Sequence, residues 1–268
     1  KYFRTNYEQP IVSNQDDRVS ARLKKMIRPY ILRRLKSDVL KELPDKIEKV
    51  IYSRMEDEQK KLYDANLQML LASLKKQTAQ EFRAGKLRIL AELTKLRQLC
   101  CDPSLVYENY RGGSAKMETC MELIRGGVSA GNQMLLFSQF TTALERIGER
   151  LKGEGIPYYM LTGSTSKEKR ARMVADFNQD GTPVFLISLK AGGTGLNLTA
   201  ATMVIHFDPW WNMAAQNQAT DRAHRIGQKQ VVTVYKLLTK DTLEEKIQKL
   251  QEQKAQLSDE IITEGSIQ

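Results

Sequence analysis

Val184-Phe-Leu-Ile187, followed at once by Ser188-Leu-Lys-Ala-Gly-Gly-Thr-Gly-Leu-Asn-Leu198, decides the fold. The first four residues form a short, continuous apolar run, which predicts a strand that is buried on both faces. Three glycines follow this run, and glycine lets backbone amides approach a phosphate closely. Ligands of open α/β sheets bind at the carboxyl ends of the strands. The stretch therefore predicts an α/β sheet with a ligand-binding loop, whereas a purely structural turn would not need Lys190, Thr194 and Asn197 as well.

Four further apolar runs alternate with amphipathic segments. The runs predict strands at Met134–Phe137, Tyr158–Leu161, Met203–Phe207 and Val231–Leu237. The segments predict helices at Ala115–Ile124, Thr141–Lys152, Lys167–Asn178 and Met213–Arg225. Continuous apolar strands that alternate with helices indicate a mostly parallel sheet covered by helices on both faces.

The first part of the chain has a different pattern. Residues 1–130 are predicted to be mostly helical, with amphipathic stretches at Glu56–Lys76 and Leu87–Cys101 and a polar tip at Lys75–Lys86. A charged helix is predicted at Thr242–Leu257. We therefore expect a helical protrusion (residues 1–113), an α/β lobe (residues 114–241) and a helical extension (residues 242–268).

Composition limits the class of protein. A net charge of +10 favours a polyanionic partner, and nucleic acid is the leading candidate. No apolar run reaches the roughly 18 residues of a transmembrane helix, and no signal peptide opens the sequence. We expect an intracellular protein without a membrane partner, cytoplasmic in a prokaryote and nuclear in a eukaryote. No metal site is expected, because Cys100, Cys101 and Cys120 lack ligand spacing and His206 and His224 are the only histidines.

A second stretch, Gln218-Ala-Thr-Asp-Arg-Ala-His-Arg-Ile-Gly-Gln228, carries two arginines, Arg222 and Arg225. On a helix they would share one face with Gln218, beside an apolar stripe formed by Ala215, Ala219, Ala223 and Ile226. Two permanently charged, bidentate donors at the edge of a buried face suit a phosphate chain. The alternative is a surface helix with two solvated arginines.

Small polar residues follow the ends of two other predicted strands. Ser138, Gln139 and Thr141 follow one strand, and Thr162, Gly163 and Ser164 follow the next. Such donors at neighbouring strand ends could track a phosphate backbone. For any single residue, a role in capping a helix is the alternative, and Thr165 or Ser166 could cap the helix that starts near Lys167.

Taken together, these motifs resemble those of superfamily-two helicases in the version of the SWI/SNF-type remodelling ATPases. Leu135–Thr141, Leu161–Arg170, Ser188–Leu198 and Gln218–Gln228 resemble motifs IV, IVa, V and VI, in that order. Phe207-Asp-Pro-Trp-Trp-Asn212 matches a family signature between motifs V and VI. Leu96-Arg-Gln-Leu-Cys-Cys-Asp-Pro103 and the segments Arg28–Val39 and Leu43–Lys46 extend the resemblance over nearly the whole chain.

The resemblance implies roles for individual residues. Arg222 and Arg225 would be arginine fingers that stabilise the transferring γ-phosphoryl group, and Gly195, Asn197 and Gln218 would contact ATP. Ser188 and Lys190 would face DNA phosphates, together with the polar row. Trp210 is expected in the core, and Trp211 is the candidate for stacking on or wedging against the nucleic-acid strand. The alternative is that both tryptophans are buried.

One departure from the family pattern is informative. The sequence contains no Gly-x-x-x-x-Gly-Lys-Ser/Thr phosphate loop and no Asp-Glu-x-His motif. Both belong to the first ATPase lobe in this family. The resemblance therefore implies a RecA-like second lobe from a larger ATPase, with ATP and Mg²⁺ held mainly by the first lobe of the same polypeptide.

We expect the parent protein to be a DNA-dependent ATPase that translocates on double-stranded DNA and remodels a DNA-bound protein substrate. The isolated chain is predicted to be inactive alone. A catalytically silent nucleic-acid-binding module is the first alternative. The lobe of an RNA helicase is the second, and the Trp-Trp and Arg-Ile-Gly-Gln signatures argue against it.

Overall fold

The computed structural model describes residues 2–14, 16–27, 43–55, 57–75, 85–191 and 195–263. The chain forms two compact units, one from residues 1–42 and 249–268 and the other from residues 43–248. The Arg28–Val39 segment of the predicted motifs lies outside the described residues, as do most of the predicted tip at Lys75–Lys86 and residues Gly192, Gly193 and Thr194.

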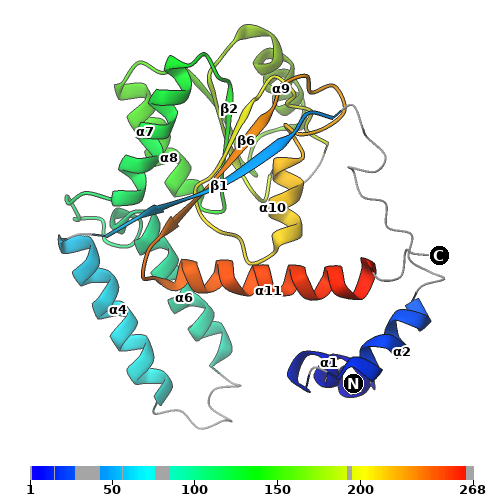
Figure 1. The fold of residues 1–268 in the computed structure, drawn as a ribbon. Helices are drawn as coiled ribbons and strands as arrows, with labels where there is room; N and C mark the ends of the chain where they lie inside the picture. The colour runs from blue at the N-terminus through cyan, green and yellow to red at the C-terminus, as the bar shows by residue number, and fades with distance from the viewer. Residues whose placement is uncertain are drawn as a thin grey trace. The chain divides into compact units, whose positions relative to one another are not determined.

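A six-stranded parallel sheet forms the centre of the larger unit. Its strands are β1 (Lys46–Ser53), β2 (Met134–Ser138), β3 (Tyr158–Leu161), β4 (Val184–Ser188), β5 (Met203–His206) and β6 (Val232–Thr239). They lie in the order β1-β6-β5-β2-β4-β3, and every neighbouring pair is parallel. The predicted α/β fold with a mostly parallel sheet is confirmed, and the sheet lies between helices (Figure 1).

The two faces of the sheet bury alternate side chains under different helices. Leu136, Leu186 and Ile205 face α7 (Ala115–Ser129) and α8 (Thr141–Gly153) in one fully buried cluster. Leu135, Phe185 and Val204 face α9 (Lys167–Asp180) and α10 (Met213–Thr220) in the other. This alternation explains the continuous apolar runs, since both faces of each central strand are covered.

Local signals fix where these helices begin and end. Ser114 caps α7 by accepting a hydrogen bond from the Met117 amide, and Ser166 caps α9 by accepting one from the Lys169 amide. Gly181 ends α9 in the left-handed region, at φ 71°. Of the two residues considered for the start of α9, Ser166 is therefore the cap.

Two helices, α4 (Asp57–Lys75) and α6 (Lys86–Cys101), lie side by side and extend away from the sheet (Figure 1). They share a small core that contains Tyr63, Leu70 and Leu99. A short 3₁₀ helix, η3 (Pro103–Leu105), then leads to the lobe. Both helices agree closely with the predicted amphipathic stretches.

Strand β1 lies within residues 1–130, where the sequence predicted mostly helices and no strand. It pairs in parallel with β6, with Lys46 opposite Val232 and Ser53 opposite Thr239. As an edge strand it leaves Ile47 and Tyr52 exposed, so its sequence lacks the continuous apolar run that marked the other strands. Part of the predicted protrusion thus contributes to the sheet of the lobe.

Helix α10 corrects a second prediction, because it ends at Thr220 instead of Arg225. Beyond it the amide of Arg222 donates to the carbonyl of Ala219, and the amide of Ala223 donates to that of Thr220, so the chain tightens into turns. Gly227 follows at φ 100°. Arg222 and Arg225 therefore do not share a helix face, and Ile226 is 73% exposed and does not extend an apolar stripe.

The smaller unit contains η1 (Arg4–Glu8), α1 (Gln9–Asn14) and α2 (Asp17–Ile27), with Tyr7 buried among them. Helix α11 (Leu243–Thr263) begins in the larger unit, and its later residues belong to the smaller one. Its start is fixed by a buried ion pair between Lys116 and Glu244. None of the described helices combines the length and apolar character needed to cross a membrane.

Candidate functional site

All strands of the sheet end at the same edge, because all of them run parallel. Ser138 and Ser188 are partners in adjacent strands β2 and β4, and Leu161 of β3 is paired with Ile187 of β4. The residues that follow these strand ends therefore stand next to one another in space. This arrangement brings the predicted polar row together, as parallel topology requires.

One member of the row, Ser138, is buried, and so is its strand partner Ser188. Ser138 is fully buried, and its hydroxyl donates to Asp208 Oδ1 at 2.5 Å and accepts from the Phe140 amide at 3.0 Å. Ser188 is 2% exposed. The Ser138 hydroxyl is therefore engaged by Asp208 in this structure, and its role as a DNA contact stays a prediction.

The remaining polar residues of the row are accessible. Thr141 is exposed at the start of α8, and Gly163, Ser164 and Lys190 are also exposed. The hydroxyls of Thr162 and Ser164 lie 2.9 Å apart within one hydrogen bond. Because Ser166 supplies the cap of α9, neither of these two hydroxyls is used for capping.

The loop after β4 is anchored by apolar side chains. Leu196 and Leu198 are buried, whereas Gly195 and Asn197 between and beside them are exposed. Gly195 has φ 65°, a conformation that favours glycine. The side chain of Asn178 on α9 donates to the carbonyl of Asn197 at 2.8 Å. The loop therefore presents its glycine and asparagine outward from a fixed base.

The two arginines lie directly against this loop. The Leu198 amide donates to the Arg222 carbonyl at 3.0 Å, and Arg225 Nη1 donates to the Leu196 carbonyl at 3.2 Å. Arg222 is 8% exposed, and its Nε has no hydrogen-bond partner among the described residues. Burial, together with the neighbouring charge of Arg225, lowers the pKa of Arg222. Gln218, the third predicted residue, lies exposed on α10.

Gln228 locks the arginine turn to the loop, which the sequence reasoning missed. Its Nε2 donates to the carbonyl oxygens of Thr199, Ala201 and Ala223 at 3.0, 2.9 and 3.2 Å. Its position at the end of the arginine motif was the only signal in the sequence. These hydrogen bonds hold the turn after α10 against the loop before β5, although α10 lies between the two segments in the sequence.

A second network missed from the sequence is built on Arg97 and Asp208, which are 3% and 1% exposed. Their side chains form an ion pair of 3.5 Å between α6 and the segment after β5. Burial raises the pKa of Asp208, although Arg97 and Ser138 act in the opposite direction. The guanidinium also lies 5.5 Å from the ring centroid of Trp211, which is 44% exposed. Trp210 is half-buried.

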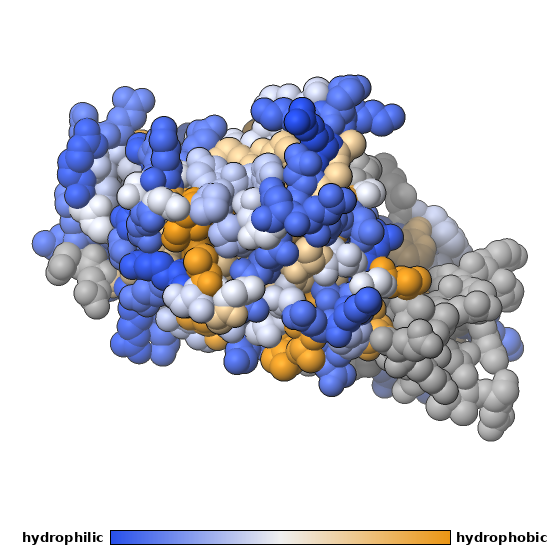
Figure 2. Space-filling model, turned by 90° about the horizontal axis from the view of Figure 1, so that it is seen from above, coloured by the Kyte–Doolittle hydropathy of each residue, from blue (hydrophilic) through white to orange (hydrophobic). Residues whose placement is uncertain are grey.

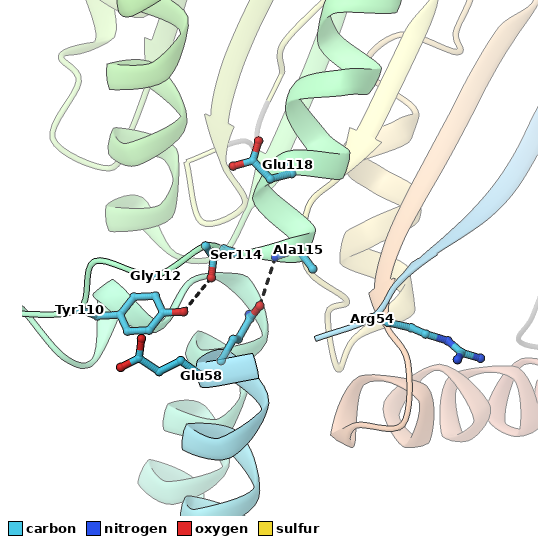
Figure 3. Close-up of a pocket in the computed structure, with 9 residues that line it drawn as sticks. Arg54, Glu58, Tyr110, Gly112, Ser114, Ala115 and Glu118 are labelled. Atoms are coloured by element: carbon cyan, nitrogen blue, oxygen red, sulfur yellow. Dashed lines mark hydrogen bonds between the residues drawn. The ribbon is translucent and has the colours of Figure 1, made fainter. Parts of the chain in front are cut away.

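Figure 3 shows a separate pocket at the start of α7. Its volume is about 440 Å³. Gln59 accepts a hydrogen bond from the Ala115 amide there, and the Tyr110 hydroxyl donates to the Gly113 carbonyl. Glu58 and Glu118 line the pocket, and their negatively charged carboxylates would repel a phosphate. None of the predicted site residues lines this pocket. Elsewhere, the surface visible in Figure 2 is mostly hydrophilic with separate hydrophobic patches.

Comparisons with known proteins identify the family of this sequence. Residues 115–227 match the helicase conserved C-terminal domain, and residues 1–105 match the SNF2-related domain. A Mycoplasma pneumoniae protein named "Uncharacterized ATP-dependent helicase" is 42% identical over 88% of this chain and 22% of its own length. The chain spans 22%, 29% and 25% of the lengths of three curated relatives that it matches.

Solved structures match the same fold. The C-terminal domain of the Sulfolobus solfataricus SWI2/SNF2 ATPase is 32% identical, with a TM-score of 0.67 over 81% of this chain and 90% of that domain. The core of the same ATPase in complex with double-stranded DNA is 34% identical, with a TM-score of 0.69 over 98% of this chain and 56% of that one.

Proposed function

Because this chain belongs to the SWI2/SNF2 family of ATPases and contains its helicase C-terminal lobe, we propose that it forms the second ATPase lobe of a DNA translocase. The whole protein would hydrolyse ATP, move along double-stranded DNA and remodel a DNA-bound protein. Support comes from the relative named as an ATP-dependent helicase and from the similar ATPase core bound to double-stranded DNA.

One observation carries the proposal most directly: Arg222 and Arg225 are fixed against the loop that contains Gly195 and Asn197. A buried guanidinium with an unused Nε, next to a second guanidinium, is poorly satisfied by the described residues. An anionic phosphate chain would supply the missing acceptors. We therefore assign the two arginines as fingers, with Gly195, Asn197 and Gln218 as contacts to ATP.

We propose that Mg²⁺ is held mainly by the first ATPase lobe of the same polypeptide. No group of three or more histidine, cysteine, aspartate or glutamate side chains that could hold a metal occurs in the described part of the chain. The phosphate loop would also belong to that first lobe. The lobe formed by this chain would supply Arg222 and Arg225, whose positive charges would stabilise the negative charge that develops on the transferring phosphoryl group. The division into a protrusion at 1–113, a lobe at 114–241 and an extension at 242–268 stays a proposal, in which β1 from the first region adds an edge strand to the sheet of the lobe.

The proposed DNA contacts are the accessible part of the strand-end row. They comprise groups that recognise phosphate without reading sequence, together with one aromatic ring. The residues are Gln139, Thr141, Thr162, Gly163, Ser164, Lys190 and Trp211. Ser138 and Ser188 lie beneath them and support the row from the ends of β2 and β4.

The test compares ATP hydrolysis by the complete protein with double-stranded DNA, single-stranded DNA and RNA. The proposal requires the strongest stimulation by double-stranded DNA, together with displacement of a protein roadblock from it. Stimulation by RNA alone would identify an RNA helicase. Binding of DNA without any hydrolysis would identify a silent binding module.

A further inference from the structure

Arg97 uses both the edge and the face of its guanidinium. At the edge, Nη1 donates to Gln139 Oε1 at 2.9 Å, and Nη2 donates to the Pro209 carbonyl and to Asp208 Oδ2. On the face, the group lies 5.6 Å from the ring centroid of Phe140 and 5.5 Å from that of Trp211. One buried cation thus contacts the residues that follow both β2 and β5.

Asp208 completes the arrangement from the other side. Its Oδ1 accepts from the Gln139 amide at 3.2 Å, and its Oδ2 accepts from Gln139 Nε2 at 2.5 Å. The side-chain amide of Gln139 is therefore held at both its oxygen and its nitrogen, by Arg97 and Asp208 respectively, and the second hydrogen of Nε2 is the donor that could reach a phosphate. Such a side chain has lost its rotational freedom before any ligand arrives, which reduces the entropy cost of binding.

Arginine is the side chain that this geometry needs. A planar guanidinium can donate in its plane and stack on rings at the same time, whereas a lysine ammonium is a point charge. The base of the arrangement is α6, which also forms the pair with α4 that extends away from the sheet. A shift of α6 would therefore move Arg97 and, through its contacts, Gln139 and Trp211.

We propose that Arg97 is a positioning residue, which with Asp208 holds Gln139 and Trp211 in the orientation that engages the DNA backbone. This inference rests on the proposed function, because it assumes that these two side chains face DNA. Arg97 itself is buried, so it lies beneath the surface that these side chains form.

The first experiment tests the positioning without DNA. The chain has only two tryptophans, so labelling with 5-fluorotryptophan gives two fluorine NMR resonances, which Trp210→Phe and Trp211→Phe assign. Arg97→Lys should move the Trp211 resonance and increase its solvent isotope shift. Arg88→Lys, an exposed arginine on the same helix, should move neither resonance. An unmoved Trp211 resonance in Arg97→Lys would overturn the proposal.

The second experiment measures function in the complete protein. Arg97→Lys should raise the DNA concentration for half-maximal ATPase stimulation by about tenfold, the scale of one lost charged hydrogen bond. The DNA-independent rate should stay unchanged, and Arg88→Lys should match the parent throughout. A lower rate at saturating DNA with an unchanged half-maximal concentration would contradict positioning. Loss of cooperative unfolding in Arg97→Lys would also contradict positioning, because it would show that Arg97 is needed for the stability of the whole fold.

A mutant cycle separates this inference from the proposed function. If Arg97 acts through its two neighbours, Arg97→Lys should add little to a Gln139→Ala Trp211→Ala double variant. A full additional effect would show that it acts elsewhere. If the complete protein shows no stimulation by DNA at all, the proposed function fails, while the fluorine resonances still decide whether Arg97 positions Trp211.

Discussion

Arg225 donates from Nη1 to the carbonyl oxygen of Leu196 at 3.2 Å, across a gap of 29 residues in the sequence. The reverse tie, from the Leu198 amide to the Arg222 carbonyl, closes the same contact at 3.0 Å. The loop after β4 and the turn after α10 therefore hold each other. A nucleotide that binds beside one of these segments would therefore also lie close to the other.

The first prediction concerns turnover. In the complete protein, Arg222→Ala or Arg225→Ala should lower kcat by about 10³-fold or more, the scale of a lost arginine finger. Affinity for DNA should change little, because these side chains lie against the loop that we propose to contact the nucleotide. Steady-state ATPase assays with saturating double-stranded DNA, paired with DNA-binding titrations, measure both quantities.

Lysine at either position should restore little of the rate, since it lacks the planar fork. Arg172→Ala on α9 is the matched control, because its side chain is 85% exposed and its partner is a surface aspartate. It should retain parental turnover. Near-normal turnover in both finger variants would show that the pair is only structural.

The isolated chain should not hydrolyse ATP at a measurable rate. Its sequence has no phosphate loop, and we propose that Mg²⁺ is held mainly by the first lobe, so a nucleotide would not be positioned for the fingers. The check is a phosphate-release assay on the purified 268-residue chain with and without duplex DNA. DNA-stimulated release from this chain alone would refute the half-site assignment.

Binding of the chain to DNA should be weak, independent of sequence and steeply dependent on salt. The net charge is +10, and the accessible residues of the row are suited to phosphates, which carry no sequence information. Titrations against two unrelated duplexes at several salt concentrations measure this. Strong preference for one duplex, or a flat response to salt, would contradict the phosphate-row assignment.

Acid should destabilise the lobe through His206. Burial lowers the pKa of His206 to about 3, and Lys236 adds to the effect, so the folded chain holds this ring neutral while its Nε2 pairs with Thr220. Unfolding lets it gain a proton near pH 6.5. Its contribution to stability is therefore complete above pH 6.5 and declines as pH falls toward 3.

Urea unfolding of the parent chain and of His206→Gln at pH 7.5, 6, 5.5 and 5 tests this. The difference in unfolding free energy between them should shrink by about 1.4 kcal/mol for each pH unit well below 6.5. A difference that stays constant over this range would show that His206 does not control the response.

The sequence predicted the strands that form apolar runs, including the partly buried edge strand β3, and missed β1, which has no such run. β2 and β4 are entirely buried, so their composition is uniform and apolar. β1 is mostly exposed at the edge of the sheet, and its alternation of Lys, Ile, Glu and Val is weak. The end of α10 was also missed, because the Arg222 carbonyl bonds to Leu198, a long-range contact that local periodicity does not contain.

The candidate site shows the same division. Topology places the ends of β2, β3 and β4 together, so the row could be predicted from the strand pattern. The Arg97–Asp208 pair joins residues that are 111 positions apart, and neither residue has a local pattern that marks its partner. The sequence therefore also does not show that the Ser138 hydroxyl donates to Asp208.

The last prediction is that Trp211→Ala uncouples hydrolysis from movement in the complete protein. Trp211 is 44% exposed, and the Trp210 amide beside it donates to Gln216 Oε1 on α10. That helix ends at Thr220, two residues before Arg222. A ring on DNA would therefore be joined to the finger turn by one short helix, which is a direct route for transmitting lobe closure to the strand.

ATPase rate, translocation rate and thermal stability should be measured together on Trp211→Ala, with Trp211→Phe as the variant that keeps a stacking ring. We expect translocation per ATP to fall in Trp211→Ala and to recover in Trp211→Phe, while stability changes little. A loss of about 3–5 kcal/mol, as for a buried tryptophan, would instead assign the ring to the core. If the ATPase rate and the translocation rate fall in the same proportion, translocation per ATP is unchanged. Trp211 would then contribute to DNA binding and not to coupling.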